Sequence, residues 1–112
     1  MAVLGSMLLE RDAVVTAADI IKAEDFYKET HRLVFATILK LNSDNIEADV
    51  ITVGEALKNE PGFAAGDGTS LLLELADKVP VALHVEHYAR IVHEKAMVRM
   101  IIDRARNLIR DA

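Results

Sequence analysis

The sequence predicts an all-α protein: a small orthogonal helical bundle followed by a long C-terminal helix. Aliphatic residues recur at spacings of three and four along most of the chain, which is the periodicity of amphipathic helices. Aromatic residues are few, so Leu, Ile, Val and Ala must supply the core. A length of 112 residues suits one compact unit that folds without disulfides or metals. We expect residues 1–83 to form the bundle and residues 84–112 to form the long helix.

The first half of the bundle is expected to contain three helices, at about residues 1–10, 12–22 and 30–42. Asp12 is the predicted N-cap of the second helix, because its carboxylate can accept a backbone N–H of the first turn. The segment Asp25-Phe-Tyr27 is expected to form a short link to the third helix. That third helix has the clearest inner face and should be central, with predicted core residues Val34, Phe35, Ile38 and Leu41.

A polar break and a capping signal predict the next boundaries. Asn42-Ser-Asp-Asn45 is expected to end the third helix. Thr52 and Glu55 have the spacing of a capping box, in which the side chain of each residue accepts from the backbone N–H of the other. A fourth helix should therefore run from Thr52 to about residue 60, where Pro61-Gly62 stops it.

Residues 62–68 are rich in glycine and are expected to form a loop, with Thr69 or Ser70 capping a fifth helix to about residue 77. Pro80 marks the next boundary. A phosphate-binding P-loop would need G-x-x-x-x-G-K-[ST], with the Lys reaching the phosphates. The sequence Gly66-Asp67-Gly68 has no such Lys, and Asp67 would repel an anion. The stretch is therefore interpreted as an interhelical loop.

The final helix is expected to run from about residue 84 to the end of the chain. At ~1.5 Å per residue it would span ~43 Å, which is longer than a compact bundle of this size needs. Its outer half should therefore project and pack against a partner. We call its apolar face the apolar stripe, and it comprises Val98, Ile101, Ile102, Ala105, Leu108 and Ile109.

No pattern of residues predicts catalysis. Without Cys, neither a disulfide framework nor a thiolate zinc site can form. His84 and His87 flank Glu86, but their spacing does not match the His-Glu-x-x-His pattern of zinc proteases or its inverse. Carboxylate pairs such as Glu24-Asp25 lack a nucleophile or base in a defined arrangement. We expect no catalytic, cofactor-binding or metal-binding residues in this chain.

The charge distribution favours protein partners over nucleic acid. The chain has 18 acidic and 13 basic residues, and its net charge is −5, whereas DNA affinity depends on Lys and Arg at phosphates. Acidic residues interrupt the main basic cluster near the C-terminus, so little or no direct DNA binding is expected. The apolar N-terminus lacks the basic region of a signal peptide, and no apolar run is long enough to span a membrane. A cytoplasmic protein is therefore expected.

Several segments, in order, resemble the N-terminal domain of DnaB-type replicative helicases. The first is Val3-Leu-Gly-Ser-Met-Leu8, which is similar to the family's opening helix without its acidic start. The others are Asp25-Phe-Tyr27 with His31-Arg32, Phe35, Ile38 and Leu41; Asp49-Val-Ile-Thr-Val53 with Leu57; and Val79-Pro80 with Tyr88, Ile91-Val92, Lys95-Ala96 and Arg99. The chain departs from the family pattern at Gly66-Asp67-Gly68, Leu71-Leu72, Val81 and His84.

The resemblance implies a bundle followed by a helical hairpin, of which residues 84–112 would be the first arm, without the second. In that family these domains pair through their hairpins, assemble as a trimer of dimers on the motor ring, and dock primase. ATP and Mg²⁺ would bind in a RecA-like C-terminal domain that this chain does not contain. The expected partners are thus further copies of the chain and a primase.

Two alternatives stay open. One is the helicase-binding domain of a primase, which resembles this fold; the Asp25-Phe-Tyr27 and His31-Arg32 segments favour the helicase side. The other is a free-standing helical protein with a regulatory or DNA-binding function.

Overall fold

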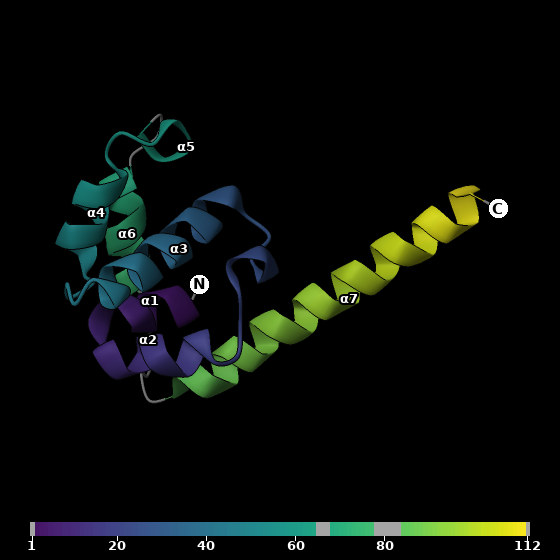
Figure 1. Ribbon diagram of the computed structural model, residues 1–112, viewed down its shortest axis with the longest axis horizontal. Coiled ribbons are helices and arrows are strands. Elements are labelled where there is room, and N and C mark those ends of the chain that lie inside the picture. The colour runs from purple at the N-terminus through teal and green to yellow at the C-terminus, as the bar shows by residue number, and fades with distance from the viewer. Residues whose placement is uncertain (1, 65–67, 78–83, 112) are drawn as a thin grey trace.

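The computed structural model describes residues 2–64, 68–77 and 84–111, and all regular structure in these ranges is helical. Figure 1 shows a compact bundle from which one long helix projects. The predicted all-α class, with a small bundle and a long C-terminal helix, is confirmed. In order, the elements are α1 (Ala2–Leu9), α2 (Arg11–Ala18), the 3-10 turn η1 (Ala23–Asp25), α3 (Glu29–Ser43), α4 (Val50–Leu57), α5 (Pro61–Ala64), α6 (Gly68–Asp77) and α7 (Val85–Asp111).

Helix α1 forms the centre of the bundle, a position that the sequence predicted for α3. Its residues from Val3 to Leu8 are all buried, and it contacts α2, α3, α6 and α7. A helix that is apolar all round is buried on every side. Ser6 is a buried polar residue on this apolar helix. Its hydroxyl donates to the backbone oxygen of Ala2 at 2.9 Å, so the buried polar atom has a hydrogen-bond partner.

Helix α3 lies against α1 and contributes Phe35, one of the two largest fully buried side chains. Val34, Phe35 and Ile38 are buried, whereas Leu41 packs against the core only partly buried. The helix ends where the polar break predicted, because Asn45 adopts a left-handed backbone with φ of 61°. The Ile46 amide then donates to the Leu41 oxygen, and the Asn45 amide donates to the Asn42 oxygen. This is the Schellman pattern, with Asn in the place of the usual Gly.

The capping box of α4 involves a different residue from the one predicted. Asp49 is the N-cap: its carboxylate accepts from the Thr52 amide at 2.9 Å, and the Thr52 hydroxyl accepts from the Asp49 amide at 2.9 Å. The predicted box from Thr52 to Glu55 was therefore wrong, and the helix begins two residues earlier. Glu55 instead pairs with Lys58 on the exposed face.

Three other predicted boundaries were also wrong. Helix α2 ends at Ala18 and not near residue 22, and its N-cap position is held by Glu10, so Asp12 lies in the first turn. Pro61 does not stop a helix but begins the short α5, since proline's fixed φ suits the first helical position. The loop predicted at 62–68 is thus partly helical.

Helix α6 begins at Gly68, one residue before the first of its predicted caps, Thr69 and Ser70. A Cβ at Gly68 would lie 2.3 Å from the ring of Phe63, so glycine allows α5 to pack closely against the start of α6. The predicted loop residues 65–67 and the predicted boundary at Pro80 lie outside the described residues.

Candidate self-association surface

Helix α7 has an inner part that packs on the bundle and an outer part that does not. Val85 and Ala89 are buried, and this end of the helix contacts α1 and α2. Every described residue from Ile101 onward is exposed. Figure 1 shows the outer part running away from the bundle, which gives the molecule its long dimension of 50 Å against 32 and 26 Å. The predicted projection of the outer half is therefore present.

The apolar stripe faces away from the bundle. Residues two apart on an α-helix lie about 200° apart around its axis. Ala89 is buried against the bundle, so Ile91, two residues later, points outward and is 38% exposed. Val98 and Ala105 follow Ile91 at intervals of seven and share its face. The bundle cannot cover this face in the observed arrangement.

The stripe residues are brought together on one face of α7. Val98 and Ala105, Ile101 and Leu108, and Ile102 and Ile109 each form a pair seven residues apart, so the side chains repeat in register along the helix. The exposed fractions are 54% for Val98, 60% for Ile101, 44% for Ile102, 73% for Leu108 and 79% for Ile109. A contiguous apolar face of this kind typically marks an interaction site.

The opposite side of α7 contacts η1 through His93 and Arg99. His93 Nδ1 lies 3.2 Å from Asp25 Oδ2, and Arg99 Nη2 donates to the Asp25 backbone oxygen at 2.8 Å. The Arg99 guanidinium also lies 5.6 Å from the centre of the Tyr27 ring. Sequence reasoning missed these contacts because the partners lie 68 and 74 positions apart, and no local pattern connects them.

A titratable group with a shifted pKa lies in the bundle and not on the stripe. Burial lowers the pKa of His31, with repulsion from Lys28 as a smaller cause, but His31 lies beside Phe26 in the bundle. Among the described residues, no three His, Asp or Glu side chains are grouped so that they could hold a metal ion. No helix in the described ranges combines the length and the apolarity that a membrane span requires.

The comparisons with known proteins agree with this architecture. The model of the DnaB-like helicase N-terminal domain family matches residues 1–94. The chain belongs to this family. In the crystal structure of the N-terminal domain of DnaB helicase from Mycobacterium tuberculosis, the fold matches with a TM-score of 0.92 at 32% identity, over 97% of this chain and 79% of that one.

Full-length relatives place the match within a longer protein. The replicative DNA helicase DnaB of Geobacillus stearothermophilus is 39% identical over 110 residues, which is 98% of this chain and 24% of that protein. The replicative DNA helicase DnaC of Bacillus subtilis (strain 168) is 33% identical over 110 residues, with the same two shares. The DnaB-type domain thus spans about a quarter of the length of these relatives.

Proposed function

We propose that this DnaB-type domain is a non-catalytic scaffold of a replicative DNA helicase, which mediates self-association in the helicase collar and docks primase. The observation that carries the proposal is the apolar stripe on the projecting part of α7. Five of its six side chains are large and apolar, and each is at least 44% exposed. Family membership supports the helicase assignment over the alternative of a primase domain.

A like helix is the partner that suits the stripe best. Its repeat of seven residues matches the spacing at which two helices interdigitate their side chains. Burying one Ile or Leu side chain yields ~1.5–3 kcal/mol, so covering even part of the stripe favours association. In a protein of the relatives' length, a second hairpin arm and a neighbouring subunit would cover it.

The proposed role requires no chemistry from this domain. The sequence contains no G-x-x-x-x-G-K-[ST] motif to cradle phosphates. ATP and Mg²⁺ would bind in a separate motor domain, and this domain would contribute assembly. Primase docking is proposed for the assembled collar and rests on family membership.

A free-standing DNA-binding protein is the competing function, and the charges disfavour it. On the outer part of α7, Asp103 and Asp111 accompany Arg104, Arg106 and Arg110. Arg99 is engaged with η1 within the chain. Any binding to DNA should therefore be weak and should disappear steeply as salt rises in a gel-shift titration. Tight binding at moderate salt would favour the competing function.

Sedimentation tests the scaffold proposal directly. The parent chain should associate reversibly at micromolar concentrations, and Ile102→Glu with Ile109→Glu should weaken association by about tenfold or more, because charges would be buried in the interface. Met100→Glu with Asn107→Glu is the matched control, since it places the same charges at the same spacing on the other side of α7. A parent chain that stays monomeric at high micromolar concentration, with α7 helical by circular dichroism, would contradict the proposal.

A further inference from the structure

Two different kinds of contact hold α7 to the bundle. At its start, Val85 and Ala89 are buried against α1 and α2, which is close apolar packing. About two turns further along, the contacts to η1 are polar and come from a few side chains. We call this group the Asp25 junction, and it consists of Asp25, Tyr27, His93 and Arg99. Beyond it, every described residue of α7 is exposed.

Asp25 makes contacts both within η1 and with α7. Its carboxylate atom Oδ2 accepts from the Lys22 amide at 3.1 Å, which caps the start of η1, and the same atom contacts His93 on α7. Its backbone oxygen accepts from Arg99. The Asp25 side chain is only 15% exposed, while that of His93 is 45% exposed. One residue therefore couples the fold of η1 to the position of α7.

The turn η1 is in turn fixed to the core. The backbone oxygen of Phe26 accepts from Arg32 Nε on α3 at 2.7 Å. The Phe26 ring is buried and lies 5.1 Å from the ring of Phe35. The η1 side of the junction is thus anchored to α3, and we place the motion on the α7 side.

Open grooves flank the junction on two sides. One has a volume of about 470 Å³ and includes Ile20, Met97 and Met100 in its lining. The other, of about 170 Å³, includes Lys28 and Lys95. Asp25 and Arg99 line both. Because α7 is not close-packed here, there is space for it to tilt once the polar contacts open.

We propose that the Asp25 junction is a positioning joint that sets the angle at which α7 leaves the bundle. When its contacts open, α7 tilts about the packed residues Val85 and Ala89 while the bundle stays folded. From Ala89 to Asp111 the helix extends ~33 Å, so a tilt of about 20° about its packed start would move its tip by about 11 Å. The consequence for collar geometry rests on the proposed function, whereas the joint itself does not.

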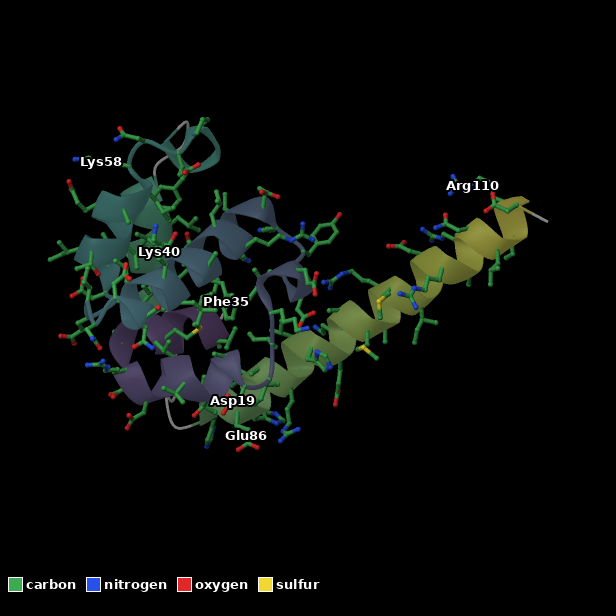
Figure 2. All side chains as sticks on the ribbon, viewed as in Figure 1. Asp19, Phe35, Lys40, Lys58, Glu86 and Arg110 are labelled. Carbon is green, nitrogen blue, oxygen red and sulfur yellow. The ribbon has the colours of Figure 1, made fainter. Side chains whose placement is uncertain are left out.

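Pulsed electron spin resonance between two spin labels tests the joint. The chain has no Cys, so Lys40→Cys on α3 and Arg110→Cys on α7 place one spin label on the bundle and one near the tip of α7. Both residues are marked in Figure 2. Excess unlabelled chain removes distances between molecules. We compare the parent with His93→Ala plus Arg99→Ala, which removes the junction from the α7 side and leaves the cap between Asp25 and Lys22 intact. His87→Ala plus Arg106→Ala is the matched control of the same residue types on exposed positions of α7.

The junction variant should broaden the distance distribution, or shift its mean, by up to about 11 Å. Its thermal midpoint should stay within about 2 °C of the parent, because the bundle is unaffected. The control should change neither quantity. An unchanged distribution would show that apolar packing at the start of α7, including that of Val92, sets its direction. A large fall in thermal midpoint would show that the contacts hold the bundle itself, and either result would overturn the joint. All three proteins are compared at one concentration, at which circular dichroism shows α7 to be helical.

Discussion

The rings of Phe26 and Phe35 pack together with their centroids 5.1 Å apart and their planes inclined by 46°. Both side chains are almost fully buried, although Phe26 follows η1 and Phe35 lies in the middle of α3. The rings of His31 and Phe26 are nearly perpendicular, with 6.4 Å between their centroids. The pair of Phe26 and Phe35 therefore joins the segment that contacts α7 to α3.

Phe35→Ala should lower the free energy of unfolding by ~3–5 kcal/mol, because it removes a buried ring and leaves a cavity beside Phe26. Urea unfolding followed by circular dichroism measures this loss. Leu73→Ala is the control, since Leu73 is 55% exposed on α6 and should cost less than about 1 kcal/mol. A loss below about 1 kcal/mol for Phe35→Ala would mean that the ring does not lie in the core.

Asp49→Ala should lower the free energy of unfolding by ~0.5–2 kcal/mol, because the Thr52 amide at the start of α4 loses its acceptor. Glu55→Ala should cost less, since it removes only an exposed ion pair with Lys58. The two variants separate the observed cap from the one that the sequence predicted. Equal losses, or a larger loss for Glu55→Ala, would contradict the observed cap.

His31 should make the bundle less stable in acid. Burial holds its pKa below the ordinary value of 6.5 in the folded state, so the unfolded chain takes up a proton first as pH falls. The free energy of unfolding should therefore decrease as pH falls through about 6.5. Below the folded-state pKa, His31 is protonated in both states and causes no further decrease. The His31→Gln variant lacks this dependence, so the parent should lose stability relative to it between about pH 7.5 and pH 5.5. Parallel pH profiles for the two proteins would contradict this.

Helical periodicity identified most of the bundle but placed several boundaries wrongly, for physical reasons. Ile21 lies seven residues after Val14 and looked like the last turn of α2, yet it is buried from the non-helical segment that follows Ala18. Burial at a helical spacing does not require a helix. At α4, the Thr52 hydroxyl accepts from the Asp49 amide inside an earlier cap, so it is not the N-cap of the helix.

The apolar stripe could be predicted from sequence because it depends on one helix alone. Spacing within a helix fixes which residues share a face, whatever the bundle does. The Asp25 junction could not be predicted in the same way, since the chain must fold before Asp25 meets His93 and Arg99. Burial of α1 on all sides was likewise a property of packing, although its unbroken apolar run was visible in the sequence.

The outer part of α7 should be stable as a helix only when it is associated. Residues 101–111 are exposed throughout, so little tertiary packing supports their helical form. Isolated helices shorter than about 12–15 residues are marginal in water, so this segment should fray in the monomer. Hydrogen exchange measures this segment by segment.

We therefore expect the amides of residues 101–111 to exchange quickly at low protein concentration and to become protected as concentration rises. Amides near Ala89 should be protected at all concentrations, because that part of α7 is buried on the bundle. In the variant carrying Ile102→Glu and Ile109→Glu, the outer amides should exchange quickly at every concentration, since the stripe can no longer be covered. Protection that is strong and independent of concentration in both proteins would show that α7 is stable by itself, and the stripe would then have no part in forming it.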